Sequence, residues 1–95
     1  MRGSETILLV EDEQGVREYC ATALRELGYN VIEAADAATA MRLLEEMPRT
    51  DLLLTDVGLP GMNGGDLARE AQQSRPGLPV LFVSGYARGA VLQRS

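Results

Sequence analysis

Short apolar runs alternate along the chain with segments in which apolar residues recur every three or four positions. The runs have the length of β-strands and occupy residues 7–10, 31–32, 51–56 and 78–84. The periodic segments, residues 16–27, 37–47 and 63–74, each have the pattern of one helical face. A repeated order of strand and helix predicts a single α/β unit with a parallel sheet, right-handed crossovers and helices on both faces.

Residues with strong local preferences mark the ends of the predicted helices. We expect Gly28 to end the first helix, Asp36 to cap the second and Pro48 to end it. The third helix is expected to begin near Asn63, and Pro76 marks the break before the fourth strand. No repeat, linker or low-complexity tract interrupts this order, so we expect one domain.

The apolar positions of these helices are assigned to the core, and this includes their tyrosine and methionine residues. The expected core positions are Val16, Tyr19, Cys20, Ala23, Leu24 and Leu27 on the first helix, and Ala37, Ala40, Met41, Leu44 and Met47 on the second. Cys20 is the single cysteine, and we expect a packed thiol in a reducing compartment.

The balance of charge argues against several classes of partner. The 95 residues have a formal net charge of -5 without a basic cluster, so we expect no binding to nucleic acid or to an anionic membrane. The chain contains neither His nor Lys, which excludes histidine-based catalysis and any role for an ammonium group. No apolar stretch approaches the roughly 18 residues of a membrane span, and residues 1–4 resemble an expression leader rather than a signal peptide. We therefore expect a cytoplasmic location.

Polar residues follow three of the predicted strands. Glu11 and Asp12 come after the first strand, Asp56 closes the third and Ser84 closes the fourth. Ligands of an open parallel sheet gather outside the carboxyl ends of its strands, so we expect these side chains to converge. Crowded carboxylates repel one another, and a cation is the simplest means of neutralising them. Oxygen ligands favour Mg²⁺, which commonly takes one or two carboxylates together with phosphate oxygens, so the sequence indicates phosphate chemistry.

Three motifs resemble the receiver domains of bacterial two-component response regulators, in particular those attached to hybrid sensor histidine kinases. The motifs are ILLVEDE at residues 7–13, DLLLTDVGLPGMNG at residues 51–64 and PVLFVSGYA at residues 79–87. The resemblance covers residues 5–95. It implies a flavodoxin-like three-layer sandwich with a parallel sheet in the order 2-1-3-4, in which the family's fifth strand is missing.

The resemblance also implies a role for each residue at the predicted edge. Asp56 resembles the phosphoacceptor, and Ser84 resembles the switch hydroxyl that contacts the phosphoryl group. The implied ligands of Mg²⁺ are Glu11, Asp12, Asp56 and the backbone carbonyl of Gly58. The implied partner is a sensor histidine kinase or a histidine phosphotransfer domain, and we expect a signalling module rather than an enzyme.

Two departures from the family pattern stand out. Glu11 occupies a position where many receivers have Asp, but the longer acid can still reach a cation. The chain also stops before the family's fifth strand and lacks the Lys that the family carries there. The missing strand would leave residues 79–83 as an open apolar edge, and such edges recruit another chain. We therefore expect a homodimer, formed by pairing of this edge or by exchange of residues 85–95.

Two other functions stay open. One is a truncated receiver that transfers phosphate poorly and acts as an oligomeric scaffold, which the truncation favours. The other is a Mg²⁺-dependent phosphatase of the haloacid dehalogenase type, but that family has a second Asp two residues after its nucleophile, where this chain has Gly58. Nucleotide hydrolysis and flavin binding have no support, because the chain lacks a Walker loop and the loop after the first strand is acidic.

Overall fold

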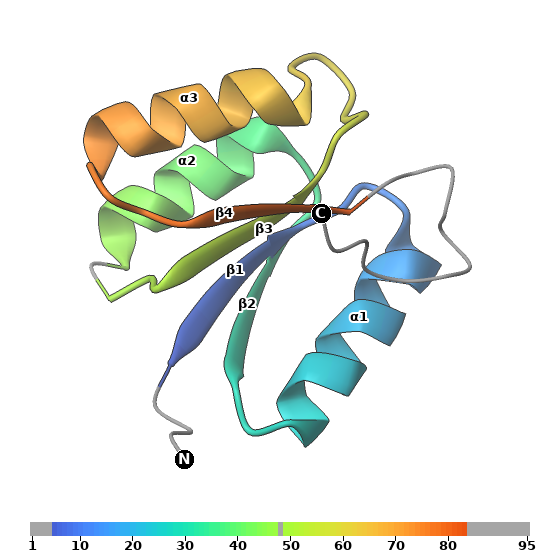
Figure 1. Cartoon of the computed structure of the whole chain (residues 1–95). Helices are drawn as coiled ribbons and strands as arrows, with labels where there is room; N and C mark the ends of the chain where they lie inside the picture. Colours follow the sequence, from blue (N-terminus) through green and yellow to red (C-terminus); the bar gives the residue numbers. More distant parts are fainter. Residues whose placement is uncertain (1–4, 48, 84–95) are drawn as a thin grey trace.

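The computed structural model describes residues 5–47 and 49–83, in which strands and helices alternate (Figure 1). The strands are β1 (Thr6–Val10), β2 (Asn30–Ala34), β3 (Leu52–Asp56) and β4 (Val80–Val83), and the helices are α1 (Gln14–Glu26), α2 (Ala37–Glu46) and α3 (Gly64–Ser74). The strands form one parallel sheet in the order β2-β1-β3-β4, which confirms the predicted topology. The expected leader, the helix stop at Pro48, Ser84 and the tail at residues 85–95 lie outside the described residues.

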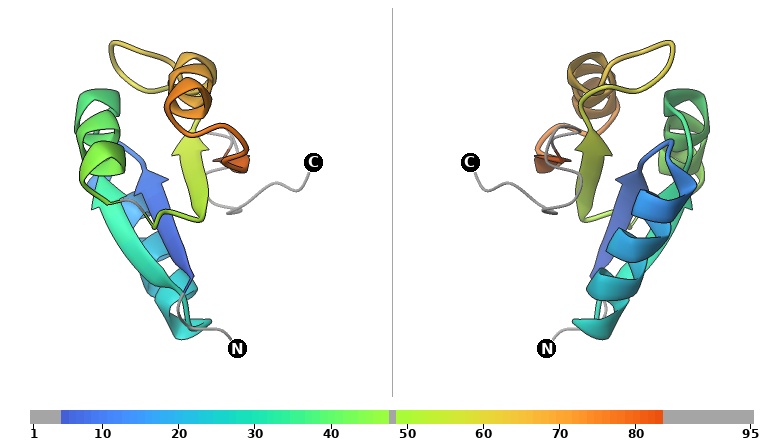
Figure 2. Two further views of the ribbon diagram at one scale, coloured as in Figure 1. Left: turned by 90° about the vertical axis from the view of Figure 1, so that its left-hand side faces the viewer. Right: turned by 90° about the vertical axis from the view of Figure 1, so that its right-hand side faces the viewer.

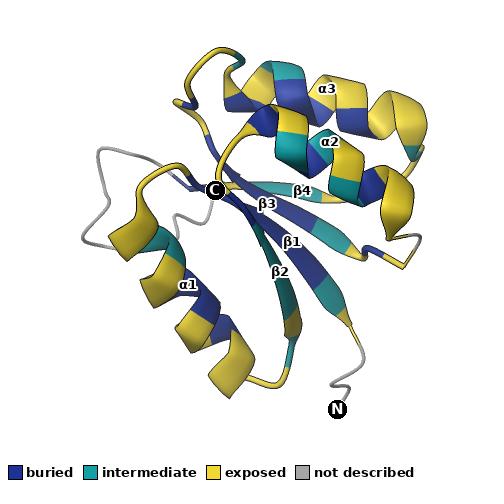
Figure 3. Cartoon of the chain, turned by 180° about the vertical axis from the view of Figure 1, so that it is seen from behind, coloured by how far each residue is buried: buried dark blue, intermediate teal, exposed yellow. Residues whose placement is uncertain are grey.

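The sheet is the middle of three layers, with α1 on one face and α2 and α3 on the other (Figure 2). Alternate residues of β1 point to opposite faces: Ile7 and Leu9 pack with α1, whereas Leu8 and Val10 pack with α2 and α3. The central strands are the most buried part of the molecule, and the outward sides of the helices are exposed (Figure 3). Leu8 and Leu9 are each 1% exposed, and burial of such a side chain contributes roughly 1.5–3 kcal/mol. Apolar runs buried on both faces therefore hold the sheet between its helices.

The predicted helix starts are confirmed by side-chain caps. The Asp36 carboxylate accepts a hydrogen bond from the Thr39 amide at 2.7 Å, and this bond holds the pKa of Asp36 below its usual value. The Asn63 side chain accepts from the Asp66 amide at 2.9 Å. Gly28 follows α1 with a φ of 102°, which fits its predicted role as a helix stop.

The predicted core face of α1 is partly wrong. Tyr19 is 61% exposed, Leu27 is 72% exposed, and Ala23 is exposed as well. The buried residues of α1 are Cys20, Ala21 and Leu24. Successive helical residues are rotated by about 100°, so a helix that turns Ala21 toward the sheet turns Tyr19 away from it. Leu27 lies beyond the last helical residue and does not reach the interior.

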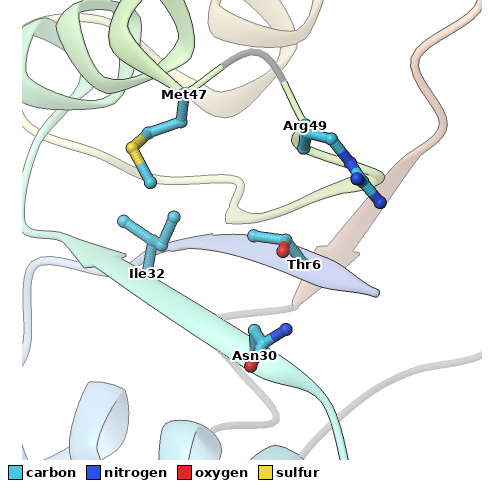
Figure 4. Close-up of a pocket in the computed structure, with 5 residues that line it drawn as sticks. All are labelled: Thr6, Asn30, Ile32, Met47 and Arg49. Atoms are coloured by element: carbon cyan, nitrogen blue, oxygen red, sulfur yellow. The ribbon is translucent and has the colours of Figure 1, made fainter. Parts of the chain in front are cut away.

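Met47, also expected in the core, instead lies at the rim of a surface pocket. It follows the last residue of α2 and is 38% exposed. Figure 4 shows its side chain directed toward Ile32. The pocket has a volume of about 370 Å³ and is lined by Thr6, Asn30, Ile32, Met47 and Arg49. Because Thr6 and Asn30 begin their strands, this pocket lies at the edge of the sheet opposite to the predicted site.

Candidate metal centre

Three carboxylates meet where β1 and β3 end. Glu11 and Asp12 directly follow β1, Asp56 is the last residue of β3, and the two strands are neighbours in the sheet. One carboxylate oxygen from each residue lies within 4.8 Å of those of the other two. Glu11 is 2% exposed and Asp56 is 1% exposed, whereas Asp12 faces solvent. The predicted convergence of these acids is therefore confirmed.

The donor set fits a hard divalent cation. Burial of Glu11 beside Asp56 costs free energy, because both charges leave water and repel each other. A divalent ion offsets both costs, and carboxylate oxygens are the ligands that Mg²⁺ prefers. The exposed Asp12 leaves one side of the cluster open to solvent, which suits an ion that retains water molecules and accepts phosphate oxygens.

The loop between β3 and α3 holds the Asp56 side chain at this edge. The Gly58 amide lies 3.4 Å from Asp56 Oδ1, in position to donate a hydrogen bond. Gly61 has a φ of 83°, a conformation that glycine adopts without strain. Leu59, a residue of the same loop, is buried. The position of the Gly58 carbonyl as a metal ligand stays a prediction.

Close contact between α3 and the end of β3 was not foreseen from the sequence. The Gly64 amide donates to the Val57 carbonyl at 2.7 Å, and a Cβ atom at residue 64 would overlap the carbonyl oxygen of Asp56. The sequence contains two adjacent glycines after the Asn63 cap, but it does not indicate which of them lies against Asp56. Gly64 thus allows α3 to begin directly over the backbone of the candidate phosphoacceptor.

The fourth strand places its end next to Asp56. Val83, the last described residue of β4, pairs with Asp56 in the sheet register. Thr55, fully buried on β3, donates its hydroxyl hydrogen to the Asp56 carbonyl at 3.0 Å. Ser84 is the next residue after Val83 and lies outside the described residues, so its contact with a phosphoryl group stays a prediction.

A charged network beside the carboxylates was also missed. The guanidinium of Arg17 donates from Nη1 to the Glu11 carbonyl at 2.9 Å and from Nε to Glu33 Oε1 at 3.3 Å. Glu33 Oε2 also lies 3.2 Å from Arg25 Nη1. The sequence contained two signals of this network: an acid directly after the apolar Val31 and Ile32, and two arginines eight positions apart on α1.

Cys20 is buried in the α1 layer, as predicted. Its burial, and secondarily the negative charge of Glu11, raise the pKa of the thiol. The protonated thiol is a poor nucleophile, so Cys20 serves as a packing residue.

A parallel sheet ordered 2-1-3-4, with clustered carboxylates at the carboxyl ends of β1 and β3, defines a receiver-type fold. The chain belongs to the response regulator receiver domain family, whose signature matches residues 7–95.

Relatives and solved structures agree with this assignment. The chain is 43% identical over 91 residues to the sensor kinase CckA of Brucella abortus, covering 95% of this chain and 10% of that protein's length. It is similar to the crystal structure of the receiver domain from the hybrid histidine kinase CckA, with a TM-score of 0.79 and 45% identity over 85% of this chain and 76% of that chain. It also resembles the response regulator TrrA of Thermotoga maritima in complex with Mg²⁺-BeF, with a TM-score of 0.81 and 25% identity over 92% of this chain and 76% of that one.

Proposed function

We propose that the chain is a two-component receiver that accepts a phosphoryl group on Asp56 in the presence of Mg²⁺. The single observation that carries this proposal is the clustering of Glu11, Asp12 and Asp56 within 4.8 Å. The phosphoryl donor would be the phosphohistidine of a sensor histidine kinase or of a histidine phosphotransfer domain. Similarity to the CckA receiver supports a partner of this class.

The reaction is an in-line displacement at phosphorus. A carboxylate oxygen of Asp56 forms a bond to phosphorus while the bond from phosphorus to the donor's imidazole nitrogen breaks, and the electron pair of that bond leaves with the imidazole. The product is an acyl phosphate. The Gly58 amide, 3.4 Å from Asp56 Oδ1, helps to orient the carboxylate for attack.

Mg²⁺ would be held by Glu11, Asp12, Asp56 and the carbonyl of Gly58. When bound, the ion neutralises the charge that develops between the carboxylate and the phosphoryl oxygens. The Mg²⁺-BeF complex of TrrA supports this choice of metal. Ser84 would contact the phosphoryl group, which is supported by the register that pairs the preceding Val83 with Asp56.

The proposed role is signalling, and the phosphorylated state of Asp56 is its output rather than a released product. We assign the protein to the cytoplasm, without a nucleic-acid or membrane partner. The net charge of -5 supports the absence of these two partners. Within residues 5–47 and 49–83, no helix has the length and apolar character needed to cross a bilayer.

We further propose that two copies associate along β4. Among the described residues, β4 is an edge strand that pairs only with β3, and its Phe82 is 37% exposed. An apolar groove of about 410 Å³ runs beside it on the α1 face of the sheet. Its apolar lining consists of Ile7, Leu24, Leu27, Tyr29, Leu52, Leu54, Pro79 and Leu81. An open edge next to an apolar groove suits pairing with the same surface of a second copy.

Treatment with acetyl phosphate and Mg²⁺, followed by intact mass measurement, tests the proposed function. We expect a mass increase of one phosphoryl group that disappears in Asp56→Asn and in samples treated with a chelator. Asp51→Asn, which alters an acid at the opposite edge of the sheet, is the matched control and should label normally. A folded wild-type protein that gains no mass would overturn the proposal.

A further inference from the structure

Arg17 lies against the turn that carries two of the three carboxylates. Its guanidinium bridges the Glu11 carbonyl and the Glu33 carboxylate, and its side chain is only 17% exposed. A long cationic side chain is rarely buried this far unless its donors are paired. Arg17 therefore occupies a fixed position between β2 and the β1–α1 turn.

Glu33 provides the anchor for this arginine. It pairs with Leu9 in the sheet register, and its side chain reaches α1 on the same face as Leu9. One of its oxygens meets Arg17 and the other meets Arg25, which also donates to the Val31 carbonyl at 2.9 Å. Arg17 and Arg25 thus share one acid, but among their described contacts only Arg17 reaches the turn.

Three hydrogen bonds that involve Glu11 hold the β1–α1 turn. The Glu11 amide donates to the Ala34 carbonyl at 3.0 Å, the Glu11 carbonyl accepts from Arg17, and Glu11 Oε2 accepts from the Glu13 amide at 3.0 Å. A change at the Glu11 carbonyl would rotate the peptide that joins Glu11 to Asp12. Both carboxylates would then move relative to Asp56.

We propose that Arg17, held by Glu33, is a positioning residue that fixes the β1–α1 turn so that Glu11 and Asp12 are presented to the metal beside Asp56. This inference rests on the proposed function, because it names the residue that organises the same site. Residues that orient metal ligands without touching the metal typically change affinity by about 10–100-fold when removed.

The direction of the effect separates positioning from simple electrostatics. A cation next to an acidic site repels Mg²⁺, so loss of the Arg17 charge alone would tighten Mg²⁺ binding. Loss of a positioning contact would weaken it. The two explanations therefore predict opposite changes in the dissociation constant.

Mg²⁺ titration by calorimetry, on wild type and matched variants, is the first test. We expect Arg17→Met to weaken Mg²⁺ binding by about tenfold or more, and Arg25→Met, which removes the same charge from the same acid, to change it by less than about threefold. Arg17→Lys retains the charge but cannot span both acceptors, so its affinity should fall between those of wild type and Arg17→Met. Unchanged or tighter binding in Arg17→Met, or an equal loss in Arg25→Met, would overturn the inference. If Arg17→Met does not fold, Arg17→Lys must show the loss by itself.

Hydrogen exchange of the Glu13 amide in metal-free protein provides a second readout. We expect faster exchange in Arg17→Met than in wild type or Arg25→Met, because the bond to Glu11 Oε2 depends on the fixed turn. If wild type binds no Mg²⁺, the proposed function fails, and this amide still decides whether Arg17 positions the turn. Equal exchange in all three proteins would refute the positioning role.

Discussion

Gly64, the first residue of α3, lies so close to the end of β3 that its position has no room for a side chain beside the Asp56 carbonyl. The contact involves backbone on both sides, so rotation of a side chain cannot relieve it. Any residue larger than glycine must move either the start of α3 or the backbone of Asp56, the proposed phosphoacceptor.

Gly64→Ala is therefore expected to lower stability by about 1–3 kcal/mol, the usual cost of overpacking, and to slow labelling of Asp56 by acetyl phosphate. Urea unfolding and intact mass would measure the two effects. Gly15→Ala is the matched control: it lies in α1 with open space around its Cβ position, and it should be neutral or stabilising by up to about 1 kcal/mol. If Gly64→Ala behaves like Gly15→Ala, the close approach at Asp56 does not constrain the site.

Because Asp12 belongs to the acidic cluster, Asp12→Asn should have opposite effects on stability in the absence and in the presence of Mg²⁺. Asp12→Asn removes one of three crowded charges, so the metal-free protein should become more stable. The same change removes a ligand, so Mg²⁺ should stabilise the variant less than wild type. At a concentration about 100 times its Kd, Mg²⁺ would stabilise wild type by about 2.7 kcal/mol, and a tenfold loss of affinity would remove about 1.4 kcal/mol of this.

Thermal unfolding without Mg²⁺ measures the expected gain in stability of Asp12→Asn. Thermal unfolding with Mg²⁺ measures how much less the ion stabilises this variant than wild type. Glu45→Gln, a neutralised acid on the exposed side of α2, should retain the full response to Mg²⁺. An equal response in wild type and Asp12→Asn would show that Asp12 does not bind the ion.

The raised pKa of Cys20 predicts a loss of stability at alkaline pH. A thiol whose folded-state pKa lies above its unfolded value stabilises the protein fully below the unfolded pKa, and this contribution is lost as the pH rises through the folded pKa. The free energy of unfolding, measured with denaturant, should therefore fall more steeply for wild type than for Cys20→Ala as the pH rises from neutral to above the ordinary thiol pKa. If the free energy of unfolding depended on pH in the same way in both proteins, the raised pKa of Cys20 would be contradicted.

Thiol labelling gives an independent measurement at the same residue. Cys20 is the single cysteine and is 6% exposed, so an alkylating reagent should modify the native protein at least about an order of magnitude more slowly than the unfolded chain. Rapid labelling of the native protein would mean that α1 opens readily from the sheet.

Some parts of this structure were accessible from the sequence because they depend on local pattern. Asp36 and Asn63 precede periodic segments and act as caps in the structure. Glu11 and Asp56 could be placed together because strands of a parallel sheet end at one edge, whatever the details of packing.

Other features depend on how one element is rotated against another, which periodicity does not specify. The small residues Cys20 and Ala21 let α1 turn a different face toward the sheet from the one predicted. This rotation directs Tyr19 outward. The pairing of Arg17 with Glu33 requires both the rotation of α1 and the register of β2 against β1. Neither could be derived from residue spacing alone.

Among the described strands, β4 forms an edge of the sheet, and this edge predicts association of two copies. A lysine within an edge strand opposes pairing with another chain, because its charge must stay in water. We therefore expect wild type to have the mass of a dimer by light scattering at low micromolar concentration, and Phe82→Lys to shift toward the monomer. Tyr19→Lys makes the same kind of change at an exposed aromatic residue on α1, away from β4, and should remain dimeric. A monomeric wild type would rule out association through β4, and dissociation in Tyr19→Lys but not in Phe82→Lys would place the interface on α1 instead.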